Sequence, residues 1–265
     1  MQEDIFGNIA LSCAYEKCRA QEEIVPEHFF GIHLSGETHV ETADRSVTYK
    51  EGSIILARKN QLLRSTKTPG QNGEFKSVAI LLNETILRKY AAAHKIDEQE
   101  RYTGESIVEI RPDPFMTGYF ASLLPYADSA AKKSNPLSDL KFFEAIELLL
   151  RQNPSLRSFL FCFDVPHKIN LEQFMLQNYK FNVPLAKFAI LTGRSLATFK
   201  RDFKATFNQS PRQWLQEQRL SEAYHLITTK RQKPSDIYLN IGFENLTHFY
   251  FSFKQKYGAT PAEFK

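Results

Sequence analysis

The chain has 265 residues, of which 42% are hydrophobic and 24% charged, a composition typical of one large or two ordinary globular domains. No stretch approaches the roughly 18 apolar residues that a membrane span needs, and the first residues lack a secretory signal pattern. We therefore expect a cytoplasmic protein with no membrane partner.

The net charge of +4 hides an asymmetry along the chain. Residues 165–265 carry 15 Lys/Arg and 7 Asp/Glu, a net charge of +8, which leaves −4 for residues 1–164. A change of sign between segments indicates separate domains, of which the second prefers a polyanion. The alternative is a lysine-rich surface that is simply solvated.

Three cysteines, an odd number, argue against a disulfide framework. Cys162 lies in "FLFCF" and is expected in the core. Cys13 and Cys18 do not match the spacing of a zinc site.

Residues from about 24 to 82 read as short strands, because "FFGIHLSGETHVET", "SVTYKEGSIILARKN" and "FKSVAILLN" mix alternation with β-branched runs between turn residues. Such strands predict a small sandwich or barrel. From Glu84 the pattern becomes helical. Residues 139–152 predict an amphipathic helix, a candidate dimer contact, with an apolar face made of Leu140, Phe143, Ile146, Leu149 and Leu150.

Three histidines in the β region, His28, His33 and His39, raise the possibility of a metal-binding enzyme. A metal site on such strands needs two histidines separated by one residue, with a carboxylate nearby, and that pattern is absent. We also find no set of nucleophile, base and orienting residue. We therefore expect no metal, no cofactor and no catalytic residue.

The C-terminal third contains an internal repeat. Shifting "GRSLATFKRDFKATFNQSPRQW" by 50 residues superimposes it on the segment that ends in "NLTHFYFSFKQKYGATPAEF". The matched pairs are Phe199 and Phe249, Phe203 and Phe253, Lys204 and Lys254, Phe207 and Tyr257, Asn208 and Gly258, Ser210 and Thr260, Pro211 and Pro261, and Trp214 and Phe264.

Each copy predicts a helix, a turn and a second helix. Ser195 and Asn245 are suitable N-caps, and Asn208 and Gly258 can take the left-handed conformation that ends a helix. A short helix ending in glycine precedes each copy, so we expect two helix-turn-helix units, at about 184–207 and 234–257. The joining helix, residues 210–229, would be about 27 to 30 Å long.

These residues resemble the AraC/XylS family of bacterial transcription regulators. The resemblance is carried by "PLAKFAILTGRS", "FKRDFK…SPRQWLQEQRLSEAYHLI" and "DIYLNIGFENLTHFYFSFKQKYGATPAEF", and it covers about 165–265. The first of the two repeats also resembles the branch that contains type III secretion activators.

The resemblance implies an α+β protein of two domains. Residues 1–130 would form a cupin-like β-sandwich or barrel that senses a ligand, followed by a helical dimerisation segment at 131–164. Residues 165–265 would form an all-α DNA-binding domain of two helix-turn-helix units joined by a linker helix.

The family's DNA-contacting positions fall on twelve residues. They are Arg194, Leu196, Ala197, Lys200, Arg201 and Lys204 in the first unit, and Asn245, Leu246, Thr247, His248, Phe251 and Lys254 in the second. Lys200 and Arg201 are candidates for guanine contacts and Ala197 for a thymine methyl, while Arg194 and Lys204 would bind phosphate. An ion pair with Asp202 is the alternative for Arg201. Phe251 stands where the family has a long polar residue, so it packs either on thymine methyls or back into the protein.

The main hypothesis is a non-enzymatic, sequence-specific regulator of transcription. It would be an activator that binds double-stranded DNA as a homodimer, works with RNA polymerase, and responds to a small-molecule effector or a regulatory protein. The alternatives are a metal-cupin enzyme or a DNA-repair alkyltransferase fused to a DNA-binding module, and an architectural protein that reads DNA shape.

Overall fold

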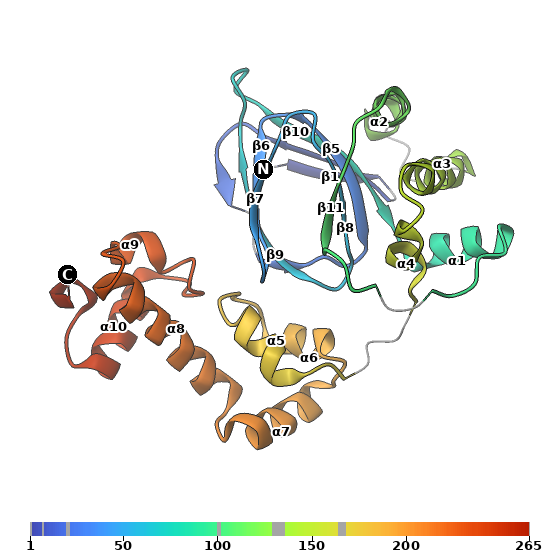
Figure 1. The fold of residues 1–265 in the computed structure, drawn as a ribbon. Helices are drawn as coiled ribbons and strands as arrows, with labels where there is room; N and C mark the ends of the chain where they lie inside the picture. Colours follow the sequence, from blue (N-terminus) through green and yellow to red (C-terminus); the bar gives the residue numbers. More distant parts are fainter. Residues whose placement is uncertain are drawn as a thin grey trace. The chain divides into compact units, whose positions relative to one another are not determined.

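The computed structural model describes residues 2–6, 8–19, 22–99, 102–128, 136–163 and 168–264. The chain divides into two compact units, Met1–Asp164 and Val165–Lys265 (Figure 1). The boundaries expected at 130/131 and 164/165 fall outside the described residues. A β-sheet unit with attached helices and an all-helical unit confirm the expected α+β class.

The N-terminal unit is built on two antiparallel sheets. The first has the strand order β1-β2-β10-β5-β8-β11, and the second has the order β3-β9-β6-β7, with β4 paired to β9. The strands are β1 Gln2–Phe6, β2 Ile9–Ala14, β3 Cys18–Arg19, β4 Glu23–Ile24, β5 His28–Ser35, β6 Glu37–Glu41, β7 Ser46–Lys50, β8 Ile54–Ala57, β9 Leu62–Thr68, β10 Phe75–Leu82 and β11 Ile107–Ile110.

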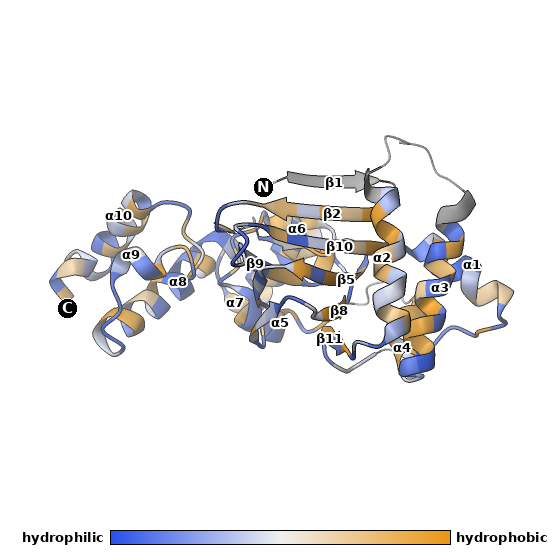
Figure 2. Cartoon of the chain, turned by 90° about the horizontal axis from the view of Figure 1, so that it is seen from above, coloured by the Kyte–Doolittle hydropathy of each residue, from blue (hydrophilic) through white to orange (hydrophobic). Residues whose placement is uncertain are grey.

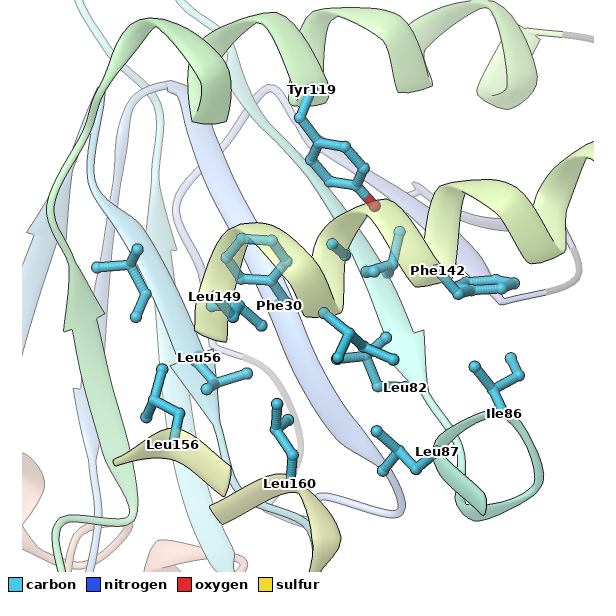
Figure 3. Packing of buried hydrophobic residues seen from close by; sticks show 14 of the residues in the cluster. Phe30, Leu56, Leu82, Ile86, Leu87, Tyr119, Phe142, Leu149, Leu156 and Leu160 are labelled. Atoms are coloured by element: carbon cyan, nitrogen blue, oxygen red, sulfur yellow. The ribbon is translucent and has the colours of Figure 1, made fainter. Parts of the chain in front are cut away.

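The described residues of this unit also form the helices α1 Glu84–Ala93, α2 Pro114–Asp128, α3 Pro136–Gln152 and α4 Leu156–Phe161. Helix α2 crosses β2 and β10 (Figure 2). Alternate residues of β10, Val78, Ile80 and Leu82, face these helices, because successive side chains of a strand point to opposite faces. They join Phe30, Leu56, Tyr119 and Leu149 in one core (Figure 3).

Helix α3 buries most of the apolar face that the sequence indicated. Ile146 and Leu149 are fully buried and Leu150 is partly buried, but Leu140 is 63% exposed, and Phe142 and Ala145, each at most 2% exposed, join the buried face. Phe143 is partly buried, with its ring edge-on to Tyr90 of α1. The buried face is therefore set by packing against α1, α2 and α4, and Leu140 falls outside it.

The C-terminal unit consists of helices. They are α5 Leu171–Asn178, α6 Leu185–Leu191, α7 Leu196–Phe207, α8 Pro211–Thr228, α9 Pro234–Ile237 and α10 Leu246–Tyr257, followed by the 3₁₀ helix η1 Pro261–Phe264. Helix α9 is one turn long and gives way to turns up to Gly242. The second helix-turn-helix unit therefore has a shorter first helix than the repeat in the sequence suggested. Tyr238, in the turn after α9, packs against the core of this half.

Within the part of the chain that the structure describes, no helix is long and apolar enough to cross a membrane.

Candidate functional site

Helix α7 is defined at both ends by its own side chains. The Ser195 hydroxyl oxygen accepts a hydrogen bond from the Thr198 backbone N–H at 3.2 Å, and Asn208 ends the helix with a φ of 53°. Phe199 and Phe203 are fully buried. Both predicted caps are confirmed, so the register of the exposed face is fixed by local interactions.

The outer face of α7 presents the predicted contact residues. Leu196 is 40% exposed, and Ala197, Lys200, Arg201 and Lys204 are exposed. These positions lie three or four residues apart and hence on one side of the helix. The structure therefore brings five of the six predicted residues of the first unit to one surface.

Arg194 is the sixth, and the structure does not place it on that surface. Its side chain is 9% exposed. The guanidinium lies 3.1 Å from the Asp202 carboxylate and donates to the backbone oxygens of Ile169 and Thr192. These contacts favour a structural role for Arg194 in place of the phosphate contact that the sequence suggested.

Asp202 is the shared acceptor beside this surface. Its hydrogen bond from Arg194 is the main cause that holds the pKa of the carboxyl below its ordinary value, and Arg201 and Lys168 add to the effect. The Arg201 guanidinium is 3.2 Å from Asp202, yet the Arg201 side chain is 73% exposed. The ion pair considered for Arg201 is therefore present, and an exposed pair of this kind is weak.

Helix α10 repeats the arrangement. The Asn245 side-chain oxygen accepts from the His248 backbone N–H at 2.7 Å, and Gly258 ends the helix with a φ of 79°. Phe249 and Phe253 are fully buried, as their counterparts are in α7.

The predicted contact residues of α10 also share one side. Thr247, His248 and Lys254 are exposed, Leu246 is half-buried, and Phe251 is 68% exposed. Phe251 therefore does not pack back into the protein. Where α7 presents Arg201, α10 presents an aromatic ring to the outside.

Arg219 of α8 links the two halves of this unit, and the sequence analysis missed it. Its guanidinium donates to the backbone oxygens of Tyr179 and Phe181 at 2.9 and 2.8 Å, and to that of Gly242 at 2.9 Å. The first two acceptors precede α6, and the third precedes α10. Arg219 follows Leu215 by four residues and precedes Ala223 by four. A cation in the middle of an apolar stripe was the sequence signal for this contact.

A second contact supports this link. Lys180 donates to Glu222 of α8 at 2.7 Å, and the Tyr179 hydroxyl lies 3.4 Å from the same carboxylate. Burial and the neighbouring Glu222 raise the pKa of Tyr179 to about 12. The tyrosine therefore stays a neutral hydrogen-bond donor at physiological pH.

The N-terminal unit has a partly open cavity of about 320 Å³ between its two sheets. Part of its wall is a patch of small residues in paired register, in which Ala79 lies opposite Ala10 and Ser77 lies opposite Ser12. Gly31, on the other side of Ala79, is closely covered, because a Cβ atom there would lie 2.8 Å from the Cβ of Ala79 and 2.9 Å from the ring of Phe29. The small side chains of β2 and β10 leave space that larger ones would fill.

Four buried polar side chains, in two hydrogen-bonded pairs, are among the residues that line the cavity. The Lys67 amino group donates to the Ser12 hydroxyl at 2.7 Å, and the His33 Nε2 lies 2.9 Å from the Thr38 hydroxyl. Burial is the main cause that lowers the pKa of His33, and the charge of Lys67 lowers it further. The cavity wall therefore combines apolar surface with the amino group of Lys67 and the carboxyl group of Glu27.

The histidines occupy structural or surface positions. His28 and His33 are 1% and 5% exposed, and His39 bonds to Thr48 and Ser46 at the surface. In the described ranges, no group of three or more His, Cys, Asp or Glu side chains is arranged to hold a metal ion. Cys162 is buried as predicted, and Cys13 and Cys18 are half-buried.

The sequence matches two family models. Residues 28–159 match the ExsA N-terminal regulatory domain, and residues 188–265 match a helix-turn-helix domain.

Two curated relatives extend over most of the chain. The virulence regulon transcriptional activator VirF of Yersinia enterocolitica is 25% identical over 245 residues, which cover 88% of this chain and 86% of VirF. The HTH-type transcriptional regulator ExsA of Pseudomonas aeruginosa is 24% identical over 254 residues, covering 95% and 90%. Among solved structures, an apo form of ToxT from Vibrio cholerae aligns with 97% of this chain and 96% of ToxT, at 13% identity and a TM-score of 0.46.

Proposed function

The chain belongs to the AraC/XylS family of bacterial transcription regulators, and on this premise we propose that it is an activator that reads two adjacent major-groove segments of double-stranded DNA. The observation that carries the proposal is that α7 and α10 are built alike. Each has 12 residues, an N-capping side chain, two fully buried phenylalanines and an exposed opposite face.

The linker helix supports simultaneous binding by both units. Helix α8 has 18 residues. At about 1.5 Å per residue it is roughly 27 Å long, which approaches the roughly 34 Å between successive major grooves on one side of B-DNA. Arg219 holds segments from both halves against α8.

We assign base readout in the first unit chiefly to Lys200 and Arg201, whose side chains suit the acceptors of guanine, and to Ala197 beside a thymine methyl. Leu196 lies at the edge of the same face. Lys204 is assigned to phosphate, because it lies one turn further along the helix.

In the second unit we assign Thr247 and His248 to base edges, with Leu246 beside them. Lys254 is assigned to phosphate. The side-chain oxygen of Asn245 already caps α10, so its contribution to backbone contact comes from holding the helix end toward the DNA.

The test measures binding of the full chain to a duplex selected from a random pool, and to the same duplex with its sequence scrambled. The Lys200→Ala and Arg201→Ala variants should each lose about 1 to 3 kcal/mol of discrimination at one base position. Lys50→Ala, which removes an exposed cation from the N-terminal unit, should leave the discrimination unchanged. Equal affinity of the unmodified chain for selected and scrambled duplexes at physiological salt would refute sequence-specific binding.

We further propose that the N-terminal unit dimerises the protein and controls it. Leu140, exposed on α3, is the apolar position that supports contact with a second copy. Leu140→Lys should then shift the sedimentation of the full chain from dimer to monomer, whereas an unchanged dimer would exclude this contact. As an activator acting on DNA in the cytoplasm, the protein would also contact RNA polymerase.

The cavity favours a small molecule, in place of a protein partner, as the effector that controls DNA binding. Its volume lies at the lower end of the range for ligand pockets, roughly 300 to 1,000 Å³. Lys67 gives the wall a group that attracts an anion. Ala79→Leu, which places a larger side chain in the cavity, should abolish the response of DNA binding to any such effector. A response that survives this change would point to a different site.

An architectural protein that reads DNA shape is the second candidate, and the exposed ring of Phe251 is the observation that favours it. Binding that persists unchanged on scrambled duplexes would support this candidate. We do not propose an enzyme, because the curated relatives described above are transcription regulators.

A further inference from the structure

Phe251 is a large exposed aromatic residue on the helix that we assign to the DNA groove. It is 68% exposed, and it follows Thr247 by four residues and precedes Lys254 by three. These spacings place all three on one side of α10. Phe249 and Phe253 occupy the opposite, buried side. The ring of Phe251 therefore projects from the face that carries the predicted contacts.

The two recognition helices differ at this position. The repeat aligns Phe251 with Arg201, and the residue before it, Tyr250, with Lys200. Lys200 is exposed, whereas Tyr250 is half-buried against the core of its own half. The outward face of α7 therefore carries two cations where that of α10 carries one apolar ring.

Only one feature of the major groove is apolar. A phenyl ring offers no conventional hydrogen-bond donor or acceptor, and of the base edges in this groove the thymine C5-methyl group is the one that favours apolar contact. Lys254, one turn further along, can bind phosphate and hold the helix in place. The ring then loses water-exposed surface against the methyl group, which is favourable.

We infer that Phe251 reads thymine in the second half-site through contact with the C5-methyl group, while α7 reads guanine in the first half-site. The inference rests on the proposed function, because it needs α10 in the major groove. It gives the bound DNA two unlike half-sites, one recognised by hydrogen bonds and the other by apolar contact.

The test replaces thymine by deoxyuridine, one position at a time, in a selected duplex. This change removes the methyl group and leaves base pairing intact. The full chain should bind about fourfold more weakly when the thymine beside Phe251 is changed, because burying one methyl group amounts to about 0.8 kcal/mol. The same change at thymines outside both half-sites should have no effect.

Two variants separate Phe251 from the rest of the helix. Phe251→Ala should weaken binding to the thymine duplex and bind the thymine and deoxyuridine duplexes equally. Phe251→Arg should shift the selected base at this position from thymine toward guanine. Ile190→Ala is the matched control, because Ile190 is 55% exposed on α6, outside both recognition helices, and this change should keep the sensitivity to deoxyuridine.

Three results would overturn the inference and leave the proposed function intact. They are specific binding that is insensitive to deoxyuridine throughout the second half-site, sensitivity that persists in Phe251→Ala, and a DNA kink that depends on Phe251, which indicates insertion between bases. Failure of the proposed function is a different observation, since the full chain would then show no preference for any selected duplex.

Discussion

Replacing Arg219 by methionine removes the guanidinium and keeps a side chain of similar length. Three backbone oxygens, those of Tyr179, Phe181 and Gly242, then lose a donor that lies 2.8 to 2.9 Å away. A hydrogen bond from a charged donor contributes about 1.5 to 3 kcal/mol. Because Arg219 is only half-buried, water can reach some of these oxygens in the variant. We therefore expect a loss of about 3 kcal/mol in the free energy of unfolding, below the sum of the three bonds.

Urea unfolding of the full chain measures this loss directly. Trp214 is the single tryptophan of the chain, it is buried in the C-terminal unit, and its fluorescence reports that unit alone. Arg212→Met is the matched control, because Arg212 lies exposed in the first turn of the same helix and should change stability by less than about 0.5 kcal/mol.

The same variant tests the coupling between the two helix-turn-helix units of the C-terminal unit. Arg219→Met should weaken binding to a duplex with both half-sites more than binding to a duplex with the first half-site only. A stability loss below about 1 kcal/mol, or an equal loss of binding affinity for both duplexes, would refute the role of Arg219 in holding the two helix-turn-helix units together.

Three further changes probe single features of the fold. Gly242→Ala should destabilise the C-terminal unit by about 2 kcal/mol or more in the same fluorescence assay. The φ of Gly242 is 93°, and the added Cβ would lie 2.7 Å from the Arg219 Nε. An unchanged free energy of unfolding would contradict the positions of both residues. Asn245→Ala should lower the free energy of unfolding by about 1 kcal/mol through the lost N-cap, and Asn245→Ser should keep most of the original stability. If the serine variant is as unstable as the alanine variant, a capping role is excluded. Burial lowers the pKa of His28 to about 3. Below about pH 6.5 the unfolded chain therefore binds a proton at His28 that the folded chain does not bind. The free energy of unfolding then falls as the pH drops from about 6.5 toward 3. His28→Leu should reduce this pH dependence by up to about 1.4 kcal/mol per pH unit, measured by urea unfolding followed by circular dichroism, and an unchanged slope would show that other groups cause it.

The elements of the C-terminal unit could be predicted because their signals are local. Ser195 and Asn208 begin and end α7 through contacts within a few residues, and the copy fifty residues later repeats the pattern. Arg194 could not be placed in the same way. Its backbone acceptor Ile169 lies 25 residues earlier in the chain, and no local pattern distinguishes that contact from one with DNA phosphate.

The N-terminal unit was predicted less completely. The sequence indicated strands between 24 and 82 but missed β1, β2 and β11. Strands β2 and β11 pair with β10 and β8, far along the chain, and β1 pairs with β2. The cavity escaped prediction for a related reason. Ala10, Ser77 and Ala79 are ordinary as single residues, and they line a hollow only because the register of β2 and β10 places them side by side.

The unlike outer faces of α7 and α10 fix which half-site each helix occupies under the proposed assignment. Two identical recognition helices in tandem could slide by one half-site along a run of equal sites with little difference in energy. Arg201 on one helix and Phe251 on the other remove that equivalence, because under this assignment each half-site accepts only its own helix. Exchanging the two half-sites of a selected duplex should therefore abolish binding that two like helices would keep.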